Sequence, residues 1–563
     1  MATYSTSVQI PYFSGLNQGG DGYNMNLRYA RDMENVNVEG GGFKQMREGK
    51  RLEQELANPI GTLAYLHRRY NTTGTLLVAV SNKKVYTKTI DGDDDWVERF
   101  SGLTENDNDW LTYEISLYPE WTQKAYAKGE RIRKPGKVYK CTTAIETPED
   151  WTAAHWTEDE GDPDEYPLYD KTATYAVDDK VAYPETKNYK AKTDLDSEAW
   201  DASHWDEVEG TDPVDILLFT NAKDGMFCLY GDDMSVVPVA TPKKFGVIAR
   251  FNERVWGSAI DGDPDMLVYS RPYDPFDWTA DFEIPEDGAG DVLLPTWDGD
   301  VFIGLKQFGS YLLAAKRNSI WRIYGTNPGE FVMQMQYGGG TIEENTLVTH
   351  NQYAYMLGRN GMMRYDGNGT FPFLQEQVQD IFKHVNKDYL SVSTAAMRGE
   401  VYCLALPVNE STTCNAILEY DTANGLIAYR TGVSVSSFMQ VDNRLFYTSA
   451  TYPGRVYELR DDVGLPLPVL WISGWQDLGL KRSIKSAFVL YMNVEAETPL
   501  EIRVGIRTEK KLKEKIYTVK NGKPARLHLN LQGRYFRIEI RSYSAVPFAI
   551  TGGIQMDLEL DPD

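Results

Sequence analysis

The sequence predicts an all-β protein: a β-propeller with an inserted pair of small three-stranded modules and a C-terminal antiparallel β-sandwich. Three observations predict this fold class. Pairs of short apolar strands joined by polar turns recur every ~40–55 residues, as propeller blades do. An aromatic pattern between residues 110 and 215 is repeated 49 positions later. From about Leu465 onward, about seven short segments alternate apolar and polar side chains, which is typical of a sandwich.

Length and composition set the number of parts. A chain of 563 residues is too long for one core, and 42% apolar with 12% aromatic residues is enough for several cores rich in strands. We expect four parts: an N-terminal arm with the first blade (1–109), the inserted modules (110–215), the remaining blades (216–464) and the sandwich (465–563).

The clearest blade segment runs from Tyr353 to Phe371. An apolar strand up to Leu357, a turn at Asn360-Gly361, a second strand from Met362 to Tyr365 and a turn at Asp366-Gly367 predict a hairpin followed by another reversal. Similar pairs occur at 76–87, 311–324, 401–421 and 444–459, and counting all of them predicts six to eight blades. We expect a short helix at 376–385.

The insertion contains an internal duplication. Tyr126 and Tyr175, Trp151 and Trp200, and Trp156 and Trp205 are each separated by 49 positions, which defines two modules at about 118–160 and 168–208. Their order of aromatic residues resembles that of small chitin-binding-type carbohydrate-binding modules. The resemblance implies glycan stacking by Trp151, Trp156, Trp200, Trp205, Tyr139 and Tyr189. The alternative is that these rings are the cores of the modules, because units this small have few other apolar side chains.

Charge is distributed unevenly along the chain. The net charge of −24 argues against non-specific binding to nucleic acid or to an anionic membrane. Residues 141–216 carry 22 acidic and 5 basic side chains, whereas residues 471–541 carry 15 basic and 7 acidic ones. In the basic part, Lys510, Lys511, Lys513 and Lys515 are candidates for docking an acidic partner.

No catalytic, cofactor or metal motif stands out. The six histidines lack paired spacing, and no nucleophile elbow or phosphate loop is present, so we expect no cofactor and a protein that is not an enzyme. A propeller glycosidase is the alternative, with an acid and a base among Asp261, Asp263, Asp265, Asp298 and Asp300. The same Asp-Gly dipeptides are also typical of hairpin turns.

The cysteines and the hydropathy pattern indicate a reduced protein outside membranes. Cys141, Cys228, Cys403 and Cys414 have no CxxC spacing, so we expect buried thiols, with a Cys403–Cys414 disulfide across one hairpin left open. No apolar run approaches the ~18–20 residues that would span a bilayer, so no membrane insertion is expected.

Two stretches resemble a known family. Asn35-Val36-Asn37-Val38, followed by glycines 40–42 and an Arg47-x-Gly49 ending, is similar to the start of packaged-DNA stabilisation, or tail nozzle, proteins of tailed, short-tailed bacteriophages. The segment 247–278, with Phe251-Asn252, Trp256 and an Asp-Pro-x-x-Trp ending, resembles a blade of phage tail-hub and nozzle proteins.

The family resemblance implies a structural protein of the virion tail or head-to-tail connector, assembled in the host cytoplasm. It implies a homo-oligomeric ring, a hexamer, around the DNA exit channel, with portal or adaptor and tail fibre or spike proteins as neighbours. DNA would pass through the channel without specific contacts. A host-recognition tail protein that binds surface glycans is the alternative from another functional class.

Overall fold

The computed structural model describes residues 4–70, 74–117, 131–134, 137–145, 147, 151–158, 173–176, 180–182, 188–191, 202–208, 212–280, 288–296, 299–518 and 525–561. The chain divides into two compact units. The first comprises Met1–Leu63, Leu293–Thr326 and Glu330–Asp563, and the second comprises Ala64–Val292 and Asn327–Gly329. The described residues are almost entirely strands and turns, which confirms the predicted all-β class.

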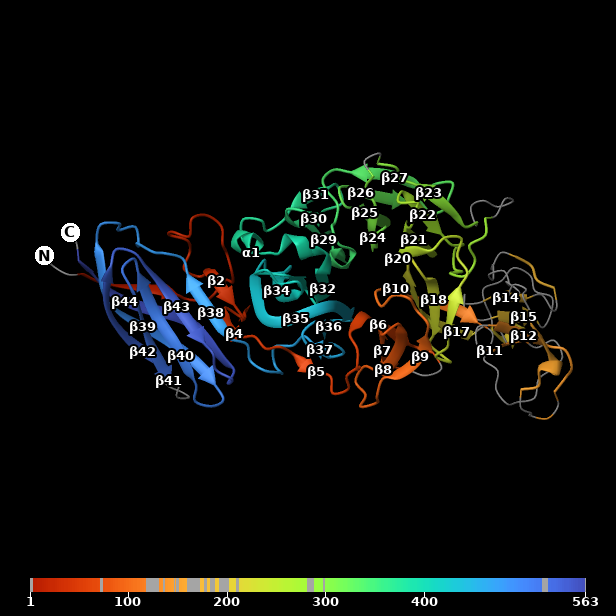
Figure 1. The fold of residues 1–563 in the computed structure, drawn as a ribbon, viewed down its shortest axis with the longest axis horizontal. Helices are drawn as coiled ribbons and strands as arrows, with labels where there is room; N and C mark the ends of the chain where they lie inside the picture. The colour runs from red at the N-terminus through yellow and green to blue at the C-terminus, as the bar shows by residue number, and fades with distance from the viewer. Residues whose placement is uncertain are drawn as a thin grey trace. The chain divides into compact units, whose positions relative to one another are not determined.

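Three four-stranded antiparallel sheets with the strand order of propeller blades belong mainly to the second unit (Figure 1). The strands of each sheet follow one another across the sheet, apart from the insertion between β10 and β17. Their bounds are β6 (Ile60–Arg68), β7 (Gly74–Ser81), β8 (Lys84–Thr89) and β9 (Val97–Ser101); β10 (Asp109–Leu117), β17 (Asp212–Asn221), β18 (Gly225–Tyr230) and β19 (Val236–Val239); β20 (Phe245–Phe251), β21 (Arg254–Ile260), β22 (Met266–Tyr269) and β23 (Gly290–Leu293).

Tight turns explain why these segments form hairpins. Asn82 and Lys83 both have positive φ angles, as do Asn252 and Glu253, and a two-residue turn with this geometry matches the twist of the strands that it joins. The strand pair predicted at 76–87 is therefore confirmed as a hairpin.

The first unit contains further blade-like sheets. Two are four-stranded, and a third has seven strands because the long strand β35 pairs with β34 through its first half and with β36 through its second half. The bounds are β24 (Phe302–Phe308), β25 (Tyr311–Lys316), β26 (Ile320–Tyr324) and β27 (Val332–Gln336); β28 (Val348–His350), β29 (Tyr353–Gly358), β30 (Gly361–Tyr365) and β31 (Thr370–Pro372); β32 (Thr394–Arg398), β33 (Val401–Leu406), β34 (Cys414–Asp421), β35 (Ile427–Val441), β36 (Arg444–Ser449), β37 (Val456–Glu458) and β5 (Lys50–Arg51). The helix predicted at 376–385 is present as the short helix α1 (Gln379–Lys383).

The inserted pair of modules appears as two separate three-stranded sheets. The first contains β11 (Arg131–Lys134), β12 (Lys137–Cys141) and β13 (Trp156–Glu158), and the second contains β14 (Lys180–Ala182), β15 (Asn188–Ala191) and β16 (Trp205–Val208). A 3-10 turn precedes the third strand in both, at Ala153–His155 and Ala202–His204. The duplication seen in the sequence is thus also a duplication of local structure.

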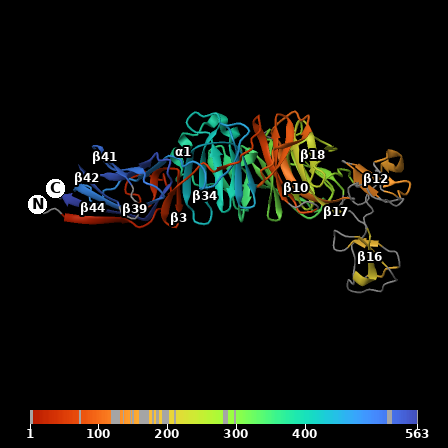
Figure 2. The same ribbon diagram turned by 90° about the horizontal axis from the view of Figure 1, so that it is seen from below.

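Two antiparallel sheets form the sandwich in the first unit. The six-stranded sheet has the order β3-β4-β44-β39-β42 with β1 also on β44, and the five-stranded sheet has the order β2-β38-β43-β40-β41. The C-terminal strands are β38 (Val469–Ser473), β39 (Ile484–Ala496), β40 (Glu501–Thr508), β41 (Leu512–Thr518), β42 (Ala525–Gly533), β43 (Phe536–Ser542) and β44 (Phe548–Asp561), and the N-terminal ones are β1 (Tyr4–Ile10), β2 (Ala30–Glu34), β3 (Val36–Glu39) and β4 (Gly42–Gln45). The N-terminal strands run among the C-terminal ones (Figure 2).

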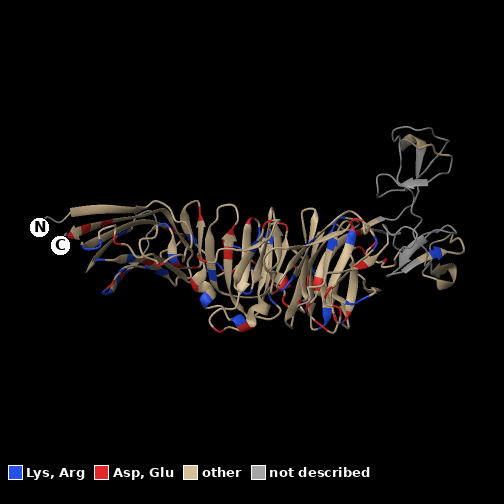
Figure 3. Cartoon of the chain, turned by 90° about the horizontal axis from the view of Figure 1, so that it is seen from above, with Lys and Arg blue, Asp and Glu red and all other residues tan. Residues whose placement is uncertain are grey.

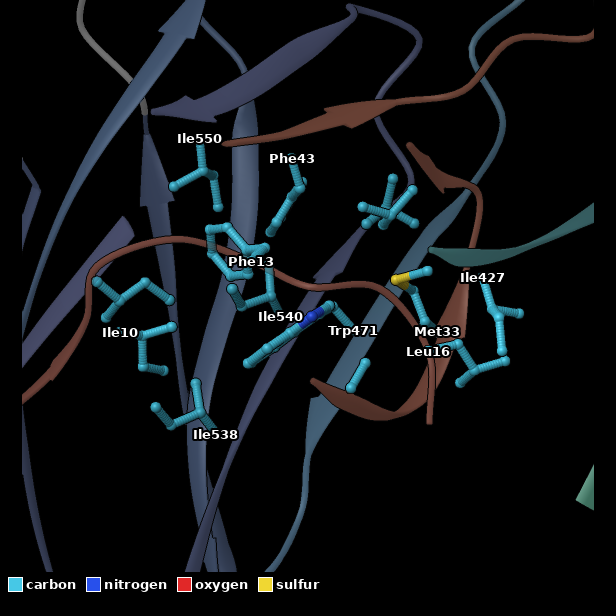
Figure 4. Packing of buried hydrophobic residues seen from close by; sticks show 14 of the residues in the cluster. Ile10, Phe13, Leu16, Met33, Phe43, Ile427, Trp471, Ile538, Ile540 and Ile550 are labelled. Atoms are coloured by element: carbon cyan, nitrogen blue, oxygen red, sulfur yellow. The ribbon is translucent and has the colours of Figure 1, made fainter. Parts of the chain in front are cut away.

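The core of the sandwich is built by both ends of the chain. Phe13 is buried with its ring centroid 4.9 Å from that of Phe43 and 5.4 Å from that of Trp471, both in edge-on geometry (Figure 4). Ile538 and Ile540 of β43 belong to the same buried cluster. The N-terminal segment, which the sequence suggested was an arm, is therefore part of the sandwich, since its apolar side chains complete that core.

Candidate functional site

The aromatic rings of the first inserted module lie together. Trp151 and Trp156 are stacked, with ring centroids 5.3 Å apart and an interplanar angle of 14°, and Tyr139 meets Trp151 edge-on at 5.0 Å. Trp156 is 7% exposed and packs with Cys141 and Ile145, whereas Tyr139 and Trp151 are half-buried against this cluster. Trp156 therefore fills the core, and only the other two rings present a surface on which a sugar could stack.

The second module repeats the register of the first. Trp156 lies opposite Cys141 and Trp205 opposite Ala191, while Tyr139 and Tyr189 each pair with a glutamate of the third strand. The side chains of Trp205 and Tyr189 lie outside the described part of the structure, as does the whole of Trp200. Glycan stacking in the second module stays a prediction.

The four candidate docking lysines lie in the β40–β41 hairpin. Lys510 and Lys511 are exposed at its turn, and Lys515 is exposed on β41, whereas Lys513 donates to the Asn530 carbonyl at 2.8 Å. β41 is an edge strand of its sheet. Charged side chains on an edge strand also prevent pairing with strands of other molecules. The position of these lysines therefore suits protection against aggregation as well as docking.

The carboxylates considered for a glycosidase lie in turns wherever the structure describes them. Asp300 is buried and accepts backbone N–H bonds from Arg317 at 3.0 Å and Asn318 at 2.8 Å, which ties it to a turn. Asp263 is partly buried in the turn after β21 and pairs with Lys243 at 2.9 Å. Asp261 and Asp265 belong to the same turn, and Asp298 lies outside the described residues.

An ion-pair cluster that the sequence did not indicate is buried in the first unit. The Arg430 guanidinium has no exposed surface; its Nε donates to Glu419 Oε1 at 2.6 Å and a terminal nitrogen lies 2.9 Å from Asp461 Oδ1. Arg398 contacts Glu419 at 2.7 Å and Asp461 at 3.4 Å. Arg430 also donates to the Arg47 carbonyl, so the cluster joins the blade strands to the N-terminal segment. No sequence motif indicates this cluster, because its charged residues lie on separate strands and loops between Arg398 and Asp461, and Arg47 is 383 positions from Arg430.

The four cysteines are buried, and none of them forms a disulfide within the described residues. Cys403 lies opposite Glu419 across the β33–β34 pair, which places Cys414 five positions along β34 and out of reach. The Cys403–Cys414 disulfide left open by the sequence therefore does not form. Burial raises the pKa of each of these two thiols to about 12.

Among the described residues, no group of three or more histidine, cysteine or carboxylate side chains is arranged to hold a metal ion. Within the same residues, no helix has the length and apolar character needed to cross a bilayer.

Comparisons with known proteins give likenesses of fold at low identity. No family model and no curated protein matches the chain. BamB from Moraxella catarrhalis is 12% identical with a TM-score of 0.28, covering 62% of this chain and 98% of that one. The WD40 domain of Pan2 from Neurospora crassa is 7% identical with a TM-score of 0.28, covering 52% and 90%. An exo-beta-1,3-galactanase from Phanerochaete chrysosporium is 11% identical with a TM-score of 0.23, covering 55% and 94%.

These likenesses assign no activity, because their TM-scores are low. They do correct one expectation. The solved structures that match include that of an exo-beta-1,3-galactanase, and the prediction that the chain is not an enzyme is not supported. The fold class itself is confirmed as all-β, with propeller blades, the inserted pair of modules and the C-terminal sandwich.

Proposed function

We propose that this chain is a structural protein of a bacteriophage tail or head-to-tail connector, of the nozzle or packaged-DNA stabilisation type. It would form a homo-oligomeric ring in the virion, a hexamer by resemblance, around the channel through which DNA leaves. Portal or adaptor and tail fibre or spike proteins would be its neighbours. The role is mechanical: a rigid wall that retains DNA until infection.

The observation that supports the proposal is that the N-terminal strands pair with strands of the sandwich and of the last blade sheet. Within the first unit, β1, β3 and β4 join the six-stranded sheet, β2 joins the five-stranded sheet, and β5 pairs with β37 at the end of the blade sheet (Figure 1). Partners lie more than 400 positions away along the chain, as for Ser7 and Asp557. Pulling on such a tie must break several rows of backbone hydrogen bonds at once, which suits a protein under load.

The residues that carry the family resemblance build this tie. Asn35 is buried with φ of 60°, donates to the Thr431 hydroxyl at 3.0 Å and to the Pro468 carbonyl at 2.7 Å, and accepts from the Thr431 N–H. Gly49 has φ of 105°, and a Cβ there would lie 2.3 Å from the Glu458 carbonyl oxygen. Only glycine permits this approach of β5 to the last blade strand. Asn35 and Gly49 of the opening motif thus both attach the N-terminal segment to strands from the later part of the chain.

Glycan recognition by the inserted modules is the second candidate, and it is compatible with a tail protein. The observation that favours it is the half-buried Trp151 face, held by Trp156 beneath and Tyr139 at its edge. A fixed aromatic plane of this kind suits the apolar face of a sugar ring.

Native mass spectrometry and light scattering of the full-length chain test the main proposal. We expect a closed ring, and binding to purified portal or adaptor protein from the same particle. A strictly monomeric chain at micromolar concentration with no affinity for tail components would contradict it. Glycan-array binding lost in Trp151→Ala, with the fold intact, would favour recognition. Hydrolysis of aryl glycosides by the wild-type chain, abolished by an aspartate-to-asparagine change, would favour a propeller glycosidase.

A further inference from the structure

One face of the five-stranded sheet carries an ordered group of arginines. In the cross-strand register, Arg503 of β40 lies opposite Arg541 of β43, and Arg507 lies opposite Arg537. Between these two rows, Gly505 lies opposite Glu539. Because residues directly opposite in an antiparallel pair share a face, the four guanidiniums and the Glu539 carboxylate lie on the same side of the sheet.

Glu539 holds three of the arginines in place. Its side chain has no exposed surface and accepts from Arg507 Nε, from Arg537 Nε at 2.9 Å and from Arg541 at 2.7 Å. Burial by itself raises the pKa of Glu539, but the surrounding arginines outweigh it and the pKa is lowered. The carboxylate is therefore ionised, and one buried negative charge orients three positive ones.

The neighbouring strand β41 adds one further carboxylate to this face. Glu514 lies opposite Gly505, and its carboxylate reaches Arg541 at 3.0 Å. A Cβ on Gly505 would lie 2.8 Å from the Glu514 side chain, so the glycine makes room for this crossing. Asp32 of β2 also interacts electrostatically with Arg537 and Glu539. Arg503, the exposed member of the group, lies beside Ile516, which is 56% exposed.

A preorganised set of guanidiniums beside an exposed aliphatic side chain favours a protein partner over nucleic acid. Arginine and apolar side chains together are typical of protein interfaces, and a guanidinium has five N–H donors, so the three arginines that donate to Glu539 keep further donors. A phosphate backbone would also meet the carboxylates of Glu514 and Glu539, together with a chain of net charge −24. Basic and acidic side chains are both distributed over the sandwich (Figure 3).

The same chain offers an acidic surface of complementary charge. The strands β8 and β9 are joined by a turn with the sequence Asp91-Gly92-Asp93-Asp94-Asp95, whose four aspartates are exposed. Lys88 fixes its shape, because the ammonium donates to the Gly92 carbonyl at 2.7 Å and to the Asp94 carbonyl at 2.5 Å. A rigid loop with several carboxylates loses little entropy on binding and can pair with more than one guanidinium.

We propose that the arginine face formed by Arg503, Arg507, Arg537 and Arg541 docks the Asp91–Asp95 turn of a second copy of this chain. Such a contact joins two different surfaces, so it is head-to-tail and builds a ring when its rotation closes. The inference rests on the proposed ring and deepens it, since it names the two surfaces that meet.

Charge reversal in the full-length chain tests the contact. Arg503→Glu changes an exposed side chain without removing a Glu539 partner. Arg526→Glu is the matched control, because it makes the same charge change at an exposed arginine of β42, on the six-stranded sheet. We expect Arg503→Glu, and separately Asp93→Arg with Asp95→Arg, to weaken self-association about tenfold or more by sedimentation equilibrium, with little effect of Arg526→Glu. Combining both sets of changes in one chain should restore association, and high salt should weaken it in the wild type.

The outcomes separate this contact from the ring. If the wild type associates and Arg503→Glu associates equally well, the contact is wrong while the ring stands. Failure of the combined variant to recover, with an unchanged thermal unfolding profile, also overturns the pairing. A wild-type chain that stays monomeric overturns both proposals. Binding of duplex DNA that Arg503→Glu abolishes would assign the face to nucleic acid and overturn the docking of the turn.

Discussion

Replacing Arg430 with methionine tests whether the buried ion-pair cluster holds the blade sheet to the N-terminal segment. Methionine has a similar length but no charge and no donor. In the variant, Glu419 and Asp461 share the single guanidinium of Arg398, at 2.7 Å and 3.4 Å, and the Arg47 carbonyl loses the hydrogen bond from Arg430. Both buried carboxylates then lose their closest partner.

The expected cost follows from that geometry. Glu419 is 3% exposed and Arg430 has no exposed surface, so solvent cannot compensate for the lost charge. Breaking a buried pair by removing one partner typically costs ~3–5 kcal/mol, because desolvation of the remaining charge is no longer repaid. A second change, Glu419→Gln, removes one of the two carboxylates, so the double variant should lose less stability than the two single variants added together.

Native-state hydrogen exchange of the amides in β34 and β35 is the appropriate assay, because a chain with two compact units does not unfold in a single step. Arg460→Met is the control: its partner Asp462 is 60% exposed, and the surface pair is worth at most ~1 kcal/mol. A loss below ~1 kcal/mol in Arg430→Met would refute the reasoning. It would mean that water enters the cluster or that Arg398 alone neutralises both carboxylates.

The cluster also predicts a dependence on pH. Burial by itself raises the pKa of Asp461, but Arg430 and Arg398 outweigh this and lower it. A carboxylate with a lowered pKa contributes stability that is complete above the unfolded value of about 3.9 and is lost as the pH falls through the folded value. Wild-type protection of β34 and β35 should therefore fall in acid below about pH 4, and Arg430→Met should show a smaller fall.

Three further predictions concern other parts of the chain. Trp156→Ala should unfold the first inserted module, at a cost of ~3–5 kcal/mol, whereas Trp151→Ala should leave its near-UV circular dichroism largely intact; equal effects would show that both rings are core. Deleting residues 1–10 removes β1 from its pairing with β44, so amides of β44 should exchange faster while those of β25 do not change; unchanged exchange of β44 would contradict the tie. Cys403 and Cys414 should resist alkylation in the folded protein at pH 8 and react after denaturation, because burial raises the pKa of both thiols; modification of the native protein would contradict their burial.

The sequence by itself determined the local structure of this protein. Alternation of apolar and polar residues, with Asn82-Lys83 and Asn252-Glu253 at the turns, predicts the hairpins, because strand period and turn geometry are set by neighbouring residues. The 49-residue spacing likewise predicts the paired modules and nominates their rings, though it cannot tell the buried Trp156 from the half-buried Trp151.

Only the tertiary structure decided which distant segments pair. The partners of β1, β2, β4 and β5, the contact of Arg430 with the Arg47 carbonyl, and the arginine rows around Glu539 depend on strands that are not consecutive in the chain. The physical reason is that an edge strand offers the same backbone donors and acceptors to any partner, so the choice depends on which side chains complete a shared core. Phe13, which packs between Phe43 and Trp471, helps to select the partner strands in this way. No local sequence pattern predicts that contact.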